Sequence, residues 1–394
     1  MIEYNEDKLR EDLQANGGRP YQQCSISVLD TISDPGIRFD SDGVSNYYQE
    51  YKVQEQMSVF QGKEGTRKLE EMIAKIKEDG KGKKYDCITG VSGGVDSTYL
   101  VYLAKQYGLR VLVVHFDNGW NSEIAVKNIE NIISNLGFDL YTLVVNWEEF
   151  RDIQLSYFKA DVVDIEAITD HAIIATMYRL AIENNLKYIL SGTNIVTEAT
   201  LPRHWIFNKV DHKNIQSIHR KYGTIPLKTY PFFNTRLKKM AQLRGIESLS
   251  PLNLVEYNKA QIKETISREL GWKDYGGKHY ESIFTRFYQG YILPVKFGID
   301  KRKAHLSNLI FSGQISKADA LEELAKPNYN RQLLVEDKTF VLKKLGFTEK
   351  EFDEYLLRPR KEHHDFDVEK GIFEEYPLLK VFKPFVRILQ KLNG

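Results

Sequence analysis

Apolar and polar positions alternate in blocks along residues 66–195, and the blocks have two different periods. Short unalternating apolar runs are typical of parallel strands that are buried on both faces. They occur at 85–90, 110–116, 140–145 and 187–190. Apolar residues at helical spacing predict helices between and before these runs, at 66–79, 98–107, 122–136 and 169–183. The alternation predicts an α/β fold with a doubly wound parallel sheet.

The two flanking regions follow other patterns. Residues 1–64 contain the turn signals Asp34-Pro35-Gly36 and Asp42-Gly43 between short stretches, which we interpret as a small hairpin module. Beyond Tyr230 the strand pattern fades, and helices with capping or stop signals are expected at 258–270, 316–324 and 348–357. The sequence therefore predicts three parts: a module at 1–64, the sheet domain at 65–230 and a mainly helical region at 231–394.

The junction between the first strand and the next helix reads Ser92-Gly93-Gly94-Val95-Asp96-Ser97. The first N–H groups of a helix have no intrahelical partner, and the helix dipole is positive there, so such a junction can hold a phosphate. Gly93 and Gly94 let the backbone approach, and Ser92 and Ser97 add hydroxyl groups. Asp96 suits a divalent cation that bridges phosphates. The loop lacks the lysine of a Walker A motif, and a plain tight turn is the alternative interpretation.

Two further strands end in polar residues that face the same crevice, because ligands of open α/β sheets lie beyond the carboxyl ends of the strands. His115 and Asp117 follow the second strand and are candidates to contact an adenosine, or else to cap the next helix. Gly192, Thr193 and Asn194 follow the fourth strand and can approach a nucleotide.

Glu198 stands four residues beyond Asn194 and can share a magnesium ion with Asp96. A strand-to-helix turn with a surface glutamate is the alternative.

Charge and composition exclude some classes of protein. The chain has 55 basic and 54 acidic residues, a formal net charge of +1, which gives no general field for nucleic acid. No run of 18 apolar residues occurs, and the first residues are polar, so we expect a cytoplasmic protein that binds no membrane. Two distant cysteines, Cys24 and Cys87, do not suggest a disulfide.

The loop Ser92–Ser97 resembles the signature loop of the ATP pyrophosphatases, which cut ATP between its α and β phosphates. Together with His115–Trp120, Ser191–Pro202 and Lys278–Ser282, it makes roughly residues 20–360 similar to the N-acetyl sugar amidotransferases of WbpG type. The resemblance implies a PP-loop, Rossmann-like domain of the adenine-nucleotide alpha-hydrolase type, with ATP and Mg²⁺ as cofactors. It also implies adenylation of an acetamido group on a nucleotide-linked sugar and displacement of AMP by ammonia, which leaves an acetamidino group, in bacterial surface-polysaccharide (LPS O-antigen) synthesis.

The N-terminal segment of that family resembles a zinc ribbon with C-x₂-C twice. The matching positions here are Cys24, Ser27, Ser45 and Tyr48. One cysteine, two serines and a tyrosine do not make a structural zinc site, so we expect a degenerate ribbon-like module without zinc. Packing is expected to replace the metal through Tyr47, Tyr48 and Tyr51.

Two polar stretches supply further candidates. The basic and aromatic segment 203–228 and the polar residues at 278–305 suit the diphosphate and rings of a nucleotide sugar. The candidate substrate-binding residues are Arg203, Trp205, Arg286, Lys301 and Arg302. The candidate catalytic residues are Asp96, Glu198, Lys278 and His279. A solvated face, or a helical lid with surface charges, is the alternative for these stretches.

The source of ammonia and two rival functions remain open at this stage. The chain begins Met1-Ile2, and Cys87 lies inside a strand, so we expect no glutaminase activity. The resemblance implies partner subunits, a glutaminase and a cyclase-like barrel. A tRNA-thiolating or other amidating ATP pyrophosphatase is one alternative, opposed by the near-neutral charge. A non-catalytic scaffold subunit is the other, opposed by the intact phosphate loop.

Overall fold

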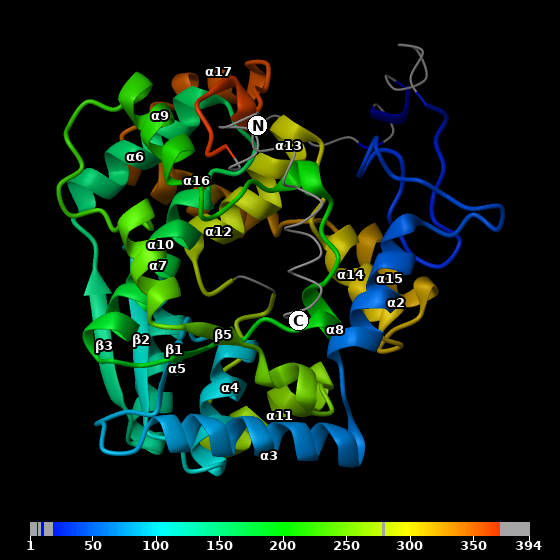
Figure 1. The fold of residues 1–394 in the computed structure, drawn as a ribbon. Helices are drawn as coiled ribbons and strands as arrows, with labels where there is room; N and C mark the ends of the chain where they lie inside the picture. Colours follow the sequence, from blue (N-terminus) through cyan, green and yellow to red (C-terminus); the bar gives the residue numbers. More distant parts are fainter. Residues whose placement is uncertain (1–5, 7–8, 12–18, 278–279, 371–394) are drawn as a thin grey trace, which may run out of the picture.

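The computed structural model describes residues 6, 9–11, 19–277 and 280–370 (Figure 1). Its centre is a parallel sheet of five strands in the order β3-β2-β1-β4-β5. The strands are β1 Cys87–Gly90, β2 Val111–Asp117, β3 Asp139–Val144, β4 Tyr188–Leu190 and β5 Glu247–Leu249. The strand order reverses between β1 and β4, and the predicted doubly wound α/β fold is confirmed.

Successive residues of the central strand point to opposite faces of the sheet, and helices cover both faces. Cys87 packs into a cluster with helices α3 Gly62–Asp79, α4 Val95–Gln106, α5 Glu123–Leu136 and α11 Lys259–Leu270. Ile88 packs on the other face against α7 Ala167–Glu183. Burial on both faces explains why β1, β2 and β4 read as unalternating apolar runs, whereas β3 lies at the edge of the sheet and is largely exposed.

A second, larger core lies beyond the carboxyl ends of the strands and is almost entirely helical. Figure 1 shows its helices across the top of the molecule. They are α6 Trp147–Ala160, α9 His212–Tyr222, α12 Ile283–Phe287, the π-helical turn η3 Tyr288–Ile292, α13 Leu293–Phe297, α16 Arg331–Leu345 and α17 Glu349–Leu357. The helical C-terminal region expected from the sequence is confirmed.

Helix α6 is absent from the sequence-based expectations because its polar residues are buried with its apolar ones. Glu149 accepts hydrogen bonds from the backbone N–H groups of Thr229 and Tyr230, at 2.8 and 3.0 Å. Asp152 accepts from the N–H and hydroxyl groups of Thr224. These carboxylates bind a loop that covers the helix. Polar positions of α6 therefore do not form the single solvent-facing stripe by which an amphipathic helix is recognised.

The N-terminal module forms less sheet than expected. Instead of paired strands, its described part contains the isolated antiparallel bridges Gln23↔Asp30 and Phe39↔Ser45. Tyr47 and Tyr51 pack with Phe311 at the end of helix α14 Arg302–Phe311, and the ring of Tyr48 lies 5.3 Å from that of Phe311. The predicted packing of these tyrosines is confirmed.

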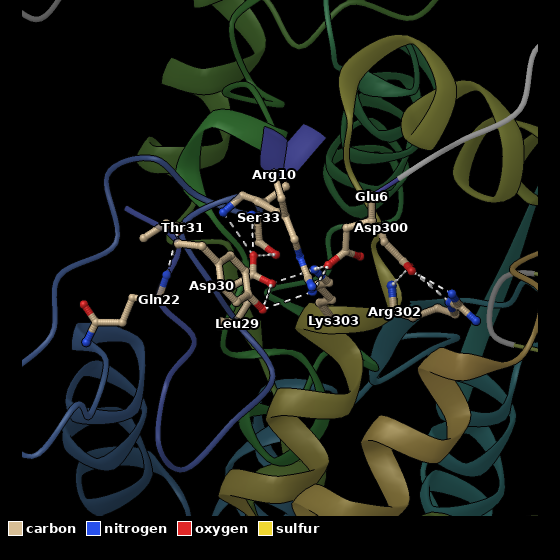
Figure 2. Close-up of polar contacts among 12 residues, drawn as sticks. Glu6, Arg10, Gln22, Leu29, Asp30, Thr31, Ser33, Asp300, Arg302 and Lys303 are labelled. Carbon is tan, nitrogen blue, oxygen red and sulfur yellow. Dashed lines mark hydrogen bonds and ion pairs between the residues drawn. The ribbon is translucent and has the colours of Figure 1, made fainter. Parts of the chain in front are cut away.

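A buried ion pair joins the module to α14 (Figure 2). The Nζ atom of Lys303 lies 2.7 Å from Asp30 Oδ2 and 3.1 Å from Glu6 Oε1. The other oxygen of Asp30 accepts hydrogen bonds from the N–H and hydroxyl of Ser33, at 2.7 and 2.8 Å. Asp30 is wholly buried, so its charge depends on these partners.

The sheet continues past Tyr230, where we expected strands to end. β5 lies at residues 247–249 and pairs with β4, so the sheet takes an edge strand from the region assigned to 231–394. The remaining helices are α2 Asn46–Ser58, α8 Ile195–Glu198, α10 Thr235–Leu243, α15 Lys317–Ala325, η1 Arg203–Trp205, η2 Pro251–Leu254 and η4 His363–Asp365. Among the residues described, no helix combines the length and apolarity that a bilayer-spanning segment needs.

Candidate functional site

The loop between β1 and α4 is fixed by close contacts on its backbone. Gly93 has a φ of +81°, and a Cβ there would lie 2.7 Å from the carbonyl oxygen of Ala125. The indole N–H of Trp272 donates to the Gly93 carbonyl at 2.8 Å. Only glycine fits this backbone and its neighbour, as expected for a loop that brings main-chain N–H groups close to a ligand.

The two serines of the loop lie on the same side of it. Their Oγ atoms are 3.3 Å apart, and the N–H of Gly94 donates to Ser92 Oγ at 3.3 Å. Both border a cavity of about 250 Å³ at the start of α4, which we call the first cavity. Ser92, Gly94, Asp96 and Ser97 therefore meet where we expected them, while Gly93 supports the loop from behind.

The loop after β4 forms the opposite wall of the first cavity. A Cβ on Gly192 would lie 3.3 Å from the backbone nitrogen of Ser97, so the two loops nearly touch. Thr193 also borders the cavity. Asn194 has a positioning role: its Oδ1 caps α8 by accepting from the Thr197 N–H at 2.9 Å, and its Nδ2 donates to Asp96 Oδ1 at 3.4 Å.

Asp96 and Glu198 both line the first cavity. Asp96 accepts a hydrogen bond from the phenol of Tyr257, which the sequence did not single out. Burial, followed by the charges of Asp96 and Glu198, raises the pKa of Tyr257, so the phenol keeps its proton. Two carboxylates beside a phosphate cradle are a donor set that fits Mg²⁺, which usually takes one or two carboxylates together with phosphate oxygens.

Residues from α11 and from the segment after it complete the first cavity, and among them only Glu281 lies in a stretch that the sequence singled out. Lys259 and Lys263 come from successive turns of α11, and Tyr275 and Glu281 come from the segment that follows it. Lys263 Nζ lies 2.6 Å from Asp274 Oδ2. The spacing of the two lysines on a predicted helix was visible in the sequence, but no motif linked that helix to the loop.

A second cavity of about 360 Å³ adjoins the first, and Ser92, Ser97 and Glu281 border both. His115 lines it, and both of its ring nitrogens have partners: Nδ1 donates to the Val91 carbonyl at 3.2 Å, and Nε2 accepts from Asn121 Nδ2 at 3.1 Å.

Asp117 lies outside both cavity walls as the structure describes them. It closes the following turn by accepting from the N–H of Gly119 at 2.8 Å. Asp117 therefore holds a turn but does not cap α5, whose N-cap is Ser122, and contact of His115 or Asp117 with an adenosine stays a prediction.

The candidate substrate-binding residues separate into two groups. Lys301 lines the second cavity, and Arg203 is exposed on η1. Trp205 is 2% exposed, and its indole N–H donates to the carbonyl of Ser33 at 2.7 Å. Trp205 therefore anchors the N-terminal module rather than facing a ligand.

Two arginines expected to bind substrate are held by carboxylates instead. Arg286 makes a forked pair with Asp337, with N–O distances of 2.7 and 2.8 Å. Arg302 pairs with Asp300 at 2.7 Å and donates to the carbonyl of Lys326 at 2.9 Å. Both guanidinium groups are used in packing helices. Lys278 and His279 lie outside the described residues, so their proposed catalytic role stays a prediction.

A parallel doubly wound sheet, with a glycine- and serine-rich phosphate loop after β1 and two carboxylates beside it, defines a nucleotide-binding protein of the PP-loop class. Family models agree. Residues 86–179 match the queuosine biosynthesis protein QueC, and residues 281–380 match the C-terminal domain of LPS biosynthesis protein WbpG-like proteins. Residues 86–179 are thus similar to an ATP pyrophosphatase-family protein and residues 281–380 to a WbpG-like C-terminal domain, so the resemblance drawn from the motifs is confirmed.

More distant relatives share parts of the chain. It is 24% identical over 279 residues to the uncharacterized protein MJ1599 of Methanocaldococcus jannaschii, which covers 68% of this chain and 82% of that protein. It is 24% identical over 202 residues to the tRNA-specific 2-thiouridylase MnmA of Clostridioides difficile, covering 46% of this chain and 50% of that protein. The solved NH3-dependent NAD synthetase of Campylobacter jejuni aligns over 72% of this chain and 97% of its own, with 12% identity and a TM-score of 0.29.

Proposed function

We propose that the protein is an ATP-dependent amidotransferase that converts an acetamido group of a nucleotide-linked N-acetyl sugar into an acetamidino group, in the synthesis of a bacterial surface polysaccharide. One observation carries this proposal. The phosphate loop, Asp96 and Glu198 line one cavity in a chain whose residues 281–380 match the WbpG-like C-terminal domain. The match supports a glycan substrate, and the cavity supports the use of ATP.

The residues of the first cavity suit the ATP half of this reaction. The N–H groups at the start of α4 and the hydroxyls of Ser92 and Ser97 hold phosphate oxygens. Asp96 and Glu198 would hold Mg²⁺, which when bound neutralises charge on the phosphates. Lys259 and Lys263 suit the departing pyrophosphate, because both border the same cavity. Neutral amides are poor electrophiles, which is why the acetamido oxygen must first be adenylated.

Ammonia then displaces AMP from the adenylated amide. We propose that partner subunits, a glutaminase and a cyclase-like barrel, deliver it to the rim formed by the loops after β2 and β4. Ammonia is scarce near neutral pH, so a docked partner raises its local concentration and keeps water from the adenylate. The isolated chain should use ammonium and should not use glutamine.

The match to MnmA favours a second candidate, thiolation or another modification of tRNA. It covers 50% of that protein, and the net charge of +1 offers little attraction for RNA. We therefore place this function second and include tRNA in the test.

The test is pyrophosphate release from ATP by the purified chain, supplied separately with ammonium plus nucleotide-linked N-acetyl sugars, with glutamine plus the same sugars, and with tRNA. We expect release only with an N-acetyl sugar, and an acetamidino product only with ammonium. Asp96→Asn should abolish release while the fold persists, because the change is isosteric; the exposed Asp42→Asn is the matched control.

Release only with tRNA would favour the second candidate. No release by the wild type with any acceptor would favour a scaffold.

A further inference from the structure

The second cavity has two unlike ends, and helix α7 runs along both. Its apolar end is formed by Val114, Phe116, Ile173 and Met177. Its polar end is formed by Asp164, Glu166, Asp170, Lys209, Gln289 and Lys301. The backbone rises about 16 Å between Glu166, which precedes α7, and Met177, because a helix rises about 1.5 Å per residue. This distance leaves room for an adenine ring at the apolar end and for a second molecule at the polar end.

The groups of the polar end are held in position before any ligand binds. Glu166 Oε1 accepts a hydrogen bond from the Thr285 hydroxyl, and its Oε2 accepts from Gln289 Nε2 at 3.3 Å. Gln289 lies in the π-helical turn η3, an irregularity that occurs frequently at functional sites. Glu166 is thus held in one orientation by Thr285 and Gln289. A fixed orientation before the ligand arrives is what a specific binding group needs.

The lysines of the polar end differ in their partners. Lys209 Nζ lies 2.6 Å from Asp164 and 3.1 Å from Asp170, so its charge is matched locally. The side chain of Lys301 makes no hydrogen bond or ion pair with any residue that the structure describes, although it borders the cavity. Burial lowers its pKa, and the charge of Glu166 opposes that shift. Lys301 is therefore a donor available to a ligand.

Charge decides which part of an acceptor fits here. The polar end holds three carboxylates against two amino groups, so a diphosphate placed beside them would add to a negative surplus in a partly desolvated space. A sugar ring is neutral, and its hydroxyl and amide N–H groups are the donors that carboxylates accept.

We propose that the polar end is the acceptor subsite and holds the N-acetyl sugar ring, with the phosphates of the nucleotide sugar outside it. This inference rests on the proposed function and adds the residues that bind the sugar: Glu166, Gln289 and Lys301.

The position also suits the chemistry. Because Ser92, Ser97 and Glu281 border both cavities, an acceptor in the second cavity faces phosphates held in the first. The acetamido oxygen forms its bond to the α-phosphorus as the bond from that phosphorus to the β-phosphate oxygen breaks. Pyrophosphate then leaves into the first cavity, opposite the acceptor, as in-line displacement requires.

Calorimetric binding tests the subsite. UDP- and CMP-linked N-acetyl sugars, each compared with its free nucleotide, are titrated into the chain with α,β-methylene-ATP present, whose bridging carbon blocks cleavage. We expect the wild type to bind at least one sugar nucleotide about tenfold more tightly than the free nucleotide. Glu166→Gln and Lys301→Met should each remove that difference, while affinity for the ATP analogue stays within about twofold. Glu183→Gln, at the far end of α7, is the matched control.

Two outcomes overturn the subsite and can be told apart. If both variants bind the sugar nucleotide like the wild type, the acceptor binds elsewhere and the proposed function survives. If no sugar nucleotide gains affinity in the wild type and tRNA supports pyrophosphate release, both the function and the subsite are wrong. Should Glu166→Gln unfold, which its melting curve would reveal, Lys301→Met and Gln289→Ala carry the test.

Discussion

The phenol of Tyr257 donates a hydrogen bond to Oδ1 of Asp96, across 161 positions of sequence. Tyr257 is 4% exposed, and burial keeps it protonated. Asn194 donates to the same oxygen. The carboxylate at the centre of the site is thus oriented by one residue from the loop after β4 and by another from the segment behind β5.

Replacing Tyr257 with phenylalanine should slow pyrophosphate release without unfolding the protein. A hydrogen bond to a charged group contributes about 1.5–3 kcal/mol, so kcat/KM for ATP should fall by at least about tenfold. Steady-state kinetics over a range of Mg²⁺ concentrations measure this. A merely structural role would lower the melting temperature and leave the dependence on Mg²⁺ unchanged. Tyr107→Phe, on the same face of the sheet, is a suitable control.

The purified protein should contain no stoichiometric zinc. Cys24 is buried, and its Sγ already accepts hydrogen bonds from the N–H groups of Ser27 and Ser45, at 3.4 and 3.3 Å. Three of the four positions that the resemblance matches to zinc ligands hold hydroxyl side chains. Elemental analysis should find no full equivalent of zinc, and a chelator should leave the melting temperature unchanged. One zinc per chain, with unfolding on chelation, would contradict this prediction.

Lys303→Met should strongly destabilise the fold. The substitution leaves Asp30 buried without its cation, and removing one partner of a buried pair costs about 3–5 kcal/mol in free energy of unfolding. Chemical denaturation measures this. The control is Lys326→Met, which breaks a 2.7 Å pair with Glu323 on the surface and should have little effect. Equal losses in free energy of unfolding for the two substitutions would show that the buried Asp30 pair stabilises the fold no more than a surface pair does.

The protein should lose stability as the pH falls from about 6.5 to about 4. Burial lowers the pKa of His171 to about 4, and that of His363 likewise. His171 is held neutral, because Nδ1 donates to the Lys209 carbonyl and Nε2 accepts from the Phe233 N–H.

In this pH range the two histidines are protonated in the unfolded chain but not in the folded chain. The free energy of unfolding therefore falls by up to about 1.4 kcal/mol per pH unit for each histidine. His171→Gln should flatten a plot of unfolding free energy against pH. An unchanged slope would exclude His171 as a source of the acid sensitivity.

Local patterns predicted the sheet and the phosphate loop well, since both depend on neighbours in sequence. The apolar runs marked β1 to β4, and Gly93 marked a backbone that only glycine adopts. The carboxyl-end rule then placed Gly192 and Glu198 opposite the loop, which the structure bears out.

Long-range partners explain what was missed. Arg286 looked available for a phosphate because its carboxylate, Asp337, lies 51 positions away. Tyr257 and Lys259 carry no motif, and they reach the site only because β5 returns the chain to the edge of the sheet. Local sequence patterns do not predict which carboxylate pairs with an arginine, or which loop a later helix packs against.

The pair between Asp30 and Lys303 also has a consequence for synthesis of the chain. The two residues lie 273 positions apart, so at about 5–20 residues per second a ribosome makes Lys303 roughly 14 to 55 s after Asp30. Until then the carboxylate has no lysine to meet and must remain hydrated. The N-terminal module therefore cannot settle onto α14 while the sheet domain emerges, and a segment translated before that domain reaches its final place after it.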